Sequence, residues 1–177
     1  MKRTPLPVAR RVVLSAVLCA VSLLFSYLET FIPMPMPGMK IGLANLIPLL
    51  LIPTVGIPDA ACVSLLRIGL SALLFGSPFS FLYSLAGGVV SFAVTVLLFR
   101  LRFFGLPGIS ILGAVAHNCG QILVAIFALG TARITVLLPW LILSGCVAGL
   151  AVGLLASLTL PRLRRAGVLP GEETKKE

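Results

Sequence analysis

The sequence predicts an all-α, polytopic membrane protein built as a bundle of six transmembrane helices. Of its 177 residues, 59% are hydrophobic and only 11% are charged, whereas soluble domains carry roughly a quarter charged residues. The region 12–160 contains just seven formally charged side chains. These counts exclude a soluble domain, a disordered chain and a secreted disulfide scaffold. They predict a cytoplasmic basic N-terminus (1–11), a transmembrane domain (12–160) and a cytoplasmic charged tail (161–177).

Six apolar stretches approach the about 20 residues that a helix needs to cross the hydrocarbon core. The first follows a basic N-terminal segment, and the separators PMPMPGMK, GIPD, GSP, RLRFFGLPG and GTAR end each stretch with proline, glycine or charge. The second stretch is interrupted by Pro48 and Pro53, so it is either a kinked helix or a re-entrant half-helix. The predicted spans are Val12–Ile32, Ile41–Ile57, Asp59–Phe75, Phe79–Phe99, Ile109–Leu129 and Ile134–Leu160.

The positions of the basic residues predict the orientation of these spans. With the N-terminus inside the cell, eleven lysines and arginines face the cytoplasm, and only Lys40 and Arg133 face outward. Cytoplasmic segments of membrane proteins carry such an excess, so both termini are predicted to be cytoplasmic in the cell membrane. The net charge of +9 is explained by these flanks, and no nucleic-acid partner is expected. The four cysteines lack metal-ligand spacing and are expected to pack as small hydrophobic residues.

Polar residues inside the predicted spans form a candidate binding site. Ionisable groups within a bilayer are costly unless they face a partner or a wet cavity. The predicted topology brings one such set together in the outer half of the bundle, beneath a candidate lid at 33–40. Its candidate substrate-binding members are Glu29, Lys40, Asn45, Arg67, Tyr83, Ser84, His117, Asn118 and Gln121.

Plainer explanations stay open for several of these residues. Serine, threonine and glycine stripes, such as the one through Ser84, Ser91 and Thr95, join membrane helices without any ligand, and packing is the favoured reading for them. Arg67 either binds an anionic group or is neutralised by Glu29. Asp59 fits the start of a helix as a cap.

Two stripes of small residues predict close helix contacts. Ala16 and Ala20 form AxxxA in the first span, and Gly145, Gly149 and Gly153 form GxxxGxxxG in the last.

Motifs for catalysis and for cofactors are absent from the sequence. There is no GxxxxGK[ST], GxSxG or HExxH, and Asp59 is the only aspartate. Prenyl diphosphate synthases hold magnesium diphosphate through clustered aspartates, because hard cations require several oxygen ligands. A single aspartate does not build such a site. We therefore expect a protein that is not an enzyme and that has no cofactor and no metal site.

Three segments carry a family resemblance, namely ETFIPMPMPGMKIGLAN (29–45), SLLRIGLSALLFGSPFSFLYSLAGG (64–88) and GAVAHNCGQ (113–121). In this order they resemble the membrane family called heptaprenyl diphosphate synthase component I, or Gx transporters, over roughly residues 10–160. That family is similar to the S components of energy-coupling factor transporters, which are six-helix proteins that capture vitamins or related small molecules. The resemblance implies a transmembrane coupling subunit and paired cytoplasmic ATPases as partners. It also implies that Ala16 and Ala20 dock the coupling subunit.

Together these inferences predict a membrane-embedded substrate-binding subunit of a small-molecule uptake transporter. Arg67 and Lys40 outnumber the single acid Glu29, so the expected substrate carries a carboxylate, a phosphate or another electron-rich group. The alternative is a non-catalytic membrane component associated with heptaprenyl diphosphate synthase, or with isoprenoid-quinone or membrane redox machinery.

Overall fold

The computed structural model describes residues 7–32 and 42–170, and over these residues the chain is helical, without strands. Short proline- and glycine-containing turns separate the helices, as the sequence predicts, and Pro58, Pro78 and Pro107 each stand in a first helical turn. The elements are α1 (Val8–Glu29), η1 (Leu43–Asn45), α2 (Leu46–Thr54), α3 (Ile57–Phe75), α4 (Pro78–Leu101), α5 (Leu106–Leu129), η2 (Ala132–Leu137) and α6 (Leu138–Arg165).

Five helices in the described part of the chain are long and apolar enough to cross a membrane: α1, α3, α4, α5 and α6 with η2. The predicted span 41–57 differs, because only Leu43–Thr54 is helical there. Twelve residues rise about 18 Å, which is short of the hydrocarbon thickness. The predicted count of six spanning helices is therefore not confirmed. Nearly every residue of α2 is buried, so this short helix fills the middle of the bundle and does not face lipid.

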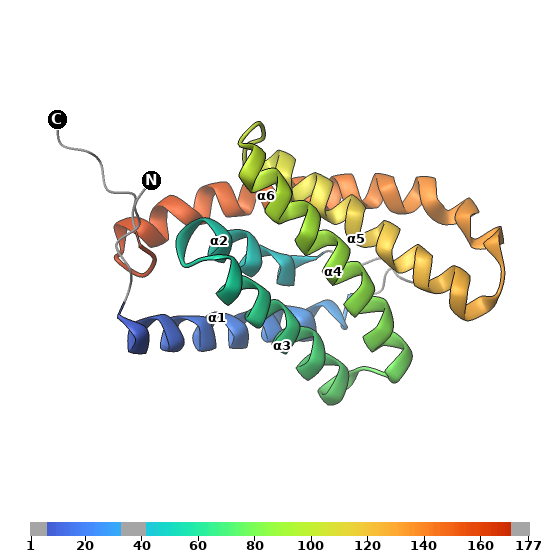
Figure 1. The fold of residues 1–177 in the computed structure, drawn as a ribbon, viewed down its shortest axis with the longest axis horizontal. Coiled ribbons are helices and arrows are strands. Elements are labelled where there is room, and N and C mark those ends of the chain that lie inside the picture. The colour runs from blue at the N-terminus through green and yellow to red at the C-terminus, as the bar shows by residue number, and fades with distance from the viewer. Residues whose placement is uncertain (1–6, 33–41, 171–177) are drawn as a thin grey trace.

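Contacts at one end of the molecule fix the path of the chain (Figure 1). Arg11 near the start of α1 pairs with Asp59 near the start of α3 at 2.5 Å, so both helices begin at the same end. Arg10 donates a hydrogen bond to the carbonyl oxygen of Gly167, just beyond α6. The segment that includes α2 therefore returns the chain to its starting end, and the first and last described residues lie together.

The side chain of Asp59 corrects one expectation from the sequence. Residue 59 lies in the first turn of α3, but Gly56 occupies the N-cap position and no side chain caps this helix. The carboxylate instead accepts two hydrogen bonds from the Arg11 guanidinium, at 2.7 and 2.5 Å. Asp59 thus joins α1 to α3.

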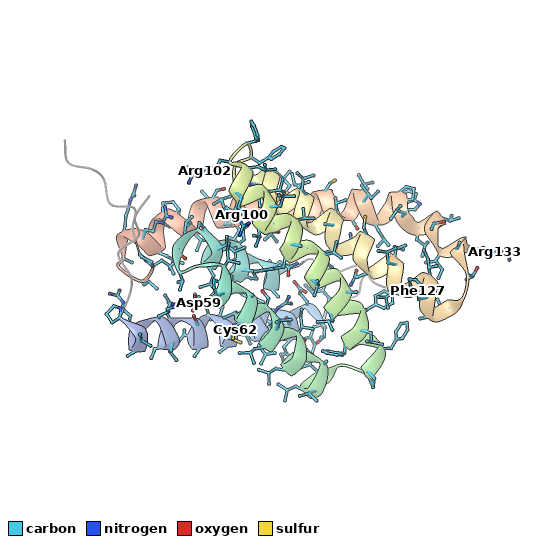
Figure 2. The ribbon with its side chains drawn as sticks, viewed as in Figure 1. Asp59, Cys62, Arg100, Arg102, Phe127 and Arg133 are labelled. Atoms are coloured by element: carbon cyan, nitrogen blue, oxygen red, sulfur yellow. The ribbon has the colours of Figure 1, made fainter. Side chains whose placement is uncertain are left out.

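Charged and apolar surfaces are distributed as expected for a protein surrounded by lipid. Arg100 and Arg102 lie in the half of the bundle where α1 begins and α6 ends, whereas Arg133 lies at the opposite end (Figure 2). Leu73 and Phe127 are 84% and 87% exposed, among many large apolar side chains on the outside. The long apolar helices and this surface mark the chain as a multi-pass membrane protein.

The GxxxGxxxG stripe of α6 packs against α5 within this chain. A Cβ atom at Gly149 would lie 2.7 Å from Cα of Ile111, and one at Gly153 would lie 2.5 Å from Cα of Pro107. Because real Cβ atoms do not approach other atoms so closely, the two backbones meet only through glycine. This stripe therefore serves folding.

Candidate ligand-binding site

Two adjoining cavities lie between helices α1–α3 and helices α4–α6. The histidine cavity, of about 40 Å³, is lined in part by Glu29, Ser84, His117 and Asn118. The hydroxyl cavity, of about 50 Å³, is lined in part by Ser64, Ser91, Thr95 and Ser110. One water needs roughly 10–15 Å³, so each cavity has room for a few waters. The two cavities share the residues Gly42, Asn45, Arg67 and Ala114.

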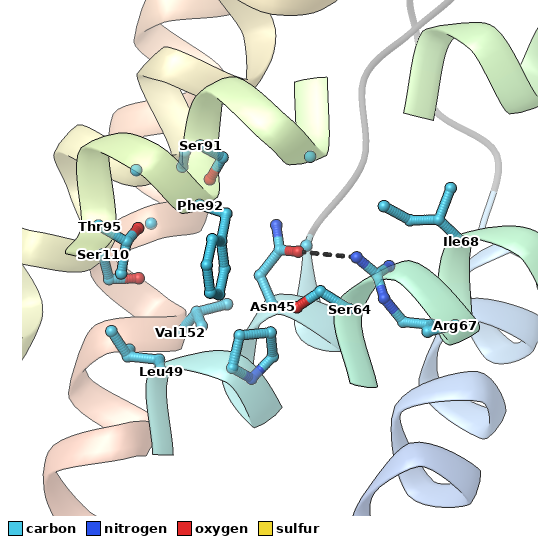
Figure 3. Close-up of a pocket in the computed structure, with 16 residues that line it drawn as sticks. Asn45, Leu49, Ser64, Arg67, Ile68, Ser91, Phe92, Thr95, Ser110 and Val152 are labelled. Atoms are coloured by element: carbon cyan, nitrogen blue, oxygen red, sulfur yellow. Dashed lines mark hydrogen bonds between the residues drawn. The ribbon is translucent and has the colours of Figure 1, made fainter. Parts of the chain in front are cut away.

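Arg67, from the middle of α3, lines both cavities, and Figure 3 shows its guanidinium bonded to Asn45. Its Nη1 donates to Oγ of Ser26 at 3.3 Å, and its Nη2 donates to Oδ1 of Asn45 at 3.2 Å. Its Nε is buried and has no hydrogen-bond partner among the described residues. Within the described chain no ion pair joins Glu29 to Arg67, but the Glu29 carboxylate lines the histidine cavity with Arg67 and acts on it electrostatically, so neutralisation of Arg67 by Glu29 remains the alternative. Two long hydrogen bonds to neutral groups offset little of the free-energy cost of burying a charged guanidinium.

The turn that presents Asn45 is tied firmly to α1. Gly42 adopts φ of +78°, a left-handed conformation that suits glycine, and η1 follows directly. The buried Ser22 hydroxyl donates to the carbonyl oxygen of Ala44 at 3.0 Å. The carboxylate of Glu29 accepts a hydrogen bond from the backbone N–H of Leu43. The Asn45 amide is thereby positioned beside Arg67.

Helix α5 contributes polar side chains to the histidine cavity. Asn118 is buried, and its Nδ2 donates to the carbonyl oxygen of Leu141 on α6 at 2.5 Å. The His117 ring lies against Gly87 of α4, where an added Cβ would be 2.9 Å from Nε2 and equally close to Cγ of Gln121. Gly87 therefore makes the space in which both side chains lie between α4 and α5.

The structure brings six of the nine predicted binding residues together. Tyr83 and Gln121 are not among the residues that line these two cavities. Tyr83 stacks on Phe79 with ring centroids 5.1 Å apart, and Gln121 is 2% exposed at the contact between α4 and α5. Lys40 and the proposed lid at 33–40 lie outside the described residues. The six that line the histidine cavity are Glu29, Asn45, Arg67, Ser84, His117 and Asn118.

Sequence reasoning missed three residues near Arg67. Ser26 was visible as part of a serine stripe on the first span, but nothing linked it to the arginine. Ser110 and Phe92 line the hydroxyl cavity. A phenylalanine in an apolar span and a serine in its first turn carry no distinguishing signal in a single sequence.

The described residues contain no group of three or more histidine, cysteine or acidic side chains arranged to hold a metal ion. Asp59 pairs with Arg11 and lines neither cavity. Asp59 therefore does not join Glu29 as a second carboxylate in the histidine cavity.

Comparison with known proteins identifies the family. Searches of curated proteins and of solved structures found no match. A family model described as heptaprenyl diphosphate synthase component I matches residues 18–159. This range includes every residue that lines the two cavities and most of each long helix. The chain therefore belongs to the heptaprenyl diphosphate synthase component I family.

Proposed function

We propose that this protein is the membrane-embedded substrate-binding subunit of an energy-coupling-factor type uptake transporter, similar to an S component. It would lie in the cell membrane with both termini in the cytoplasm. Three observations support this proposal. A cavity lies between two groups of helices, the basic residues are concentrated in the segments predicted to be cytoplasmic, and the sequence has no nucleotide-binding loop. The substrate would be a small molecule that carries a carboxylate, a phosphate or another electron-rich group.

The observation that carries the proposal is the environment of Arg67. A charged group at membrane depth is retained when it serves a partner, an ion or a wet cavity. Here the guanidinium borders both cavities, forms two long bonds to neutral side chains and has one unused N–H donor. A bound carboxylate or phosphate would accept from this planar fork of donors and neutralise it.

The expected energy source lies in partner subunits. The chain has no phosphate-binding loop, so ATP hydrolysis would come from cytoplasmic ATPases joined through a transmembrane coupling subunit. Ala16 and Ala20 are both exposed on α1, one helical turn apart. Their small side chains would let a helix of the coupling subunit approach the α1 backbone closely.

The docking part of the proposal is tested by enlarging this surface. Ala16→Leu and Ala20→Leu should abolish co-purification with the coupling subunit while the purified chain keeps its thermal stability, because both positions face outward. Ala151→Leu is the matched control, since Ala151 is an exposed alanine on α6. If both α1 variants still co-purify as wild type does, these alanines do not dock a partner.

A second candidate function rests on the family description. The chain would then be a non-catalytic membrane component that associates with heptaprenyl diphosphate synthase, or with isoprenoid-quinone or membrane redox machinery. The purified chain with an allylic diphosphate, isopentenyl diphosphate and magnesium should yield no elongated product under either candidate. Product formed without an added soluble synthase would contradict both, whereas stable co-purification with such a synthase would favour the second.

A further inference from the structure

Three hydroxyl groups that face the hydroxyl cavity lack the local bonds usual in membrane helices. Serine and threonine there commonly donate to a carbonyl of the preceding turn. Ser64 does so to Ala60 at 2.7 Å, and Ser157 to Gly153 at 2.8 Å. Within the described part of the chain no hydrogen bond involves the hydroxyls that line this cavity from α4 and α5, namely those of Ser91, Thr95 and Ser110.

Two of these hydroxyls belong to buried residues, whereas Ser110 is half-buried. Ser91 is 9% exposed and Thr95 is 8% exposed, and both side chains point inward with Ser110 (Figure 3). Gly113 of α5 stands opposite them, and an added Cβ there would lie 2.7 Å from Thr95 Oγ1 and 3.5 Å from Ser91 Oγ. A methyl group at this position would fill the space that the hydroxyls face. Because these hydroxyls line a cavity and make no hydrogen bond within the described chain, they are available to bond to an occupant.

The remaining walls of the hydroxyl cavity determine which occupant fits. Leu49, Phe92 and Val152 supply apolar surface, and Arg67 supplies the single formal charge among its lining residues. The cavity therefore offers hydrogen bonds to an uncharged polar body next to a cation that binds an acid group. A purely hydrocarbon tail would leave the three hydroxyls unbonded.

We propose that the hydroxyl cavity is a second subsite, which binds the uncharged part of the ligand through hydroxyl, carbonyl or ring-nitrogen atoms. The ligand class is thus a polar organic anion, as opposed to an anion with a hydrocarbon tail. This inference rests on the proposed function, because it takes Arg67 as the anion subsite.

Two small carboxylates of nearly equal shape test the subsite. Glycerate carries two hydroxyls where 2-methylbutanoate carries two methyl groups, and both present one carboxylate to Arg67. Binding of each probe to the full-length purified protein is measured by calorimetry and by thermal shift at constant ionic strength. Glycerate should bind at least about tenfold more tightly, because a site built for hydroxyls rejects analogues that lack them.

The decisive variant replaces Ser91→Ala, Thr95→Val and Ser110→Ala together. We expect the preference for glycerate to disappear, while the ligand-free protein keeps its Tm, because the three hydroxyls make no hydrogen bond within the described chain that would be lost. Ser157→Ala is the matched control, since its hydroxyl bonds to its own helix, and it should keep the preference. A lower Tm in the triple variant would show that the hydroxyls support the fold and would overturn the subsite.

The same measurements separate this inference from the proposed function. Arg67→Gln should weaken both probes, because the carboxylate is common to them. Equal binding of the two probes to the wild type would overturn the hydroxyl subsite and leave the anion site standing. Failure of the wild type to bind either probe would overturn the anion site, and the subsite with it.

Discussion

Helix α5 meets its neighbours through two very different interfaces. Toward α4 and α6 the backbones are in contact, with an added Cβ at Gly120 only 2.9 Å from the carbonyl oxygen of Ala86 and one at Gly149 2.7 Å from Cα of Ile111. Toward α2 and α3 the same helix borders two cavities and the guanidinium of Arg67. The first interface is as close as glycine permits, whereas the second leaves room and exposes unused hydrogen-bond donors.

This difference separates residues that build the fold from residues available to a ligand. Small residues recur on both sides of α5, so a stripe of glycine alone does not mark a site. What distinguishes the residues that line the cavities is polarity without local hydrogen bonds, at Arg67 on α3 and at the hydroxyls of Ser91 and Thr95, which lie where α4 meets α5 at Gly113. Changes in the close interface should therefore damage stability, and changes in the open interface should damage binding.

The largest effect is expected in the close interface, for Gly149→Leu. A leucine there must displace the α5 backbone at Ile111, because even its Cβ would lie 2.7 Å from that Cα. Overpacking of this kind costs about 1–3 kcal/mol or more, so the variant should lose most folded protein in detergent. Gly69→Leu is the control, since no atom lies within 4 Å of a Cβ there. Normal yield and Tm for Gly149→Leu would show that the interface is looser than described.

A smaller effect is expected at the Arg11–Asp59 pair, which joins α1 to α3 away from both interfaces of α5. Asp59→Arg should lower the Tm, because it places two guanidinium groups where an ion pair now stands. The charge-swapped double variant Arg11→Asp with Asp59→Arg should recover part of this loss. Probe binding at Arg67 should stay unchanged in the swapped protein. A double variant no more stable than Asp59→Arg alone would show that the pair makes no contribution.

The smallest effect is expected at Arg102, the one non-glycine residue in the described chain with positive φ, at +58°. It ends α4 in the left-handed conformation, which glycine adopts without steric cost. Arg102→Gly should stabilise the protein by about 0.5–1 kcal/mol. The control Arg100→Gly removes the same charge from the last turn of α4, where the backbone is still helical, and should destabilise by up to about 1 kcal/mol. Equal Tm changes of the same sign would contradict this account of the turn.

Much of the fold is predictable from the sequence, because membrane helices must be long and apolar and are separated by proline, glycine or charged residues. The predicted range 59–75 lies within two residues of α3 (Ile57–Phe75) at each end. The segment 41–57 is the exception, since nearly every residue of α2 within it is buried by protein and these residues are indistinguishable in composition from residues that face lipid. Its short helix is set by the tertiary contacts of Ala44 and Leu43 with α1.

The candidate site is predictable only as a set of polar residues at similar depth. Helical periodicity places His117 and Gln121 on one face, yet the crossing of α4 over α5 at Gly87 buries Gln121 in a helix contact. Tyr83 shares the depth of the site but stacks on Phe79. Ser91 and Thr95 are visible in the sequence as a hydroxyl stripe, for which packing is the more common explanation. Only the cavity between the helices distinguishes them.

The central claim is that Arg67 holds an anionic ligand in a cavity that the folded protein keeps open for it. Native mass spectrometry of the wild type and of Arg67→Gln, purified in parallel with equal Tm, tests it most directly. The wild type should release a small, non-lipid anion that is absent from the folded Arg67→Gln protein. If the Arg67→Gln protein is well folded and carries the same molecule at the same occupancy, Arg67 does not bind the ligand and the claim is contradicted.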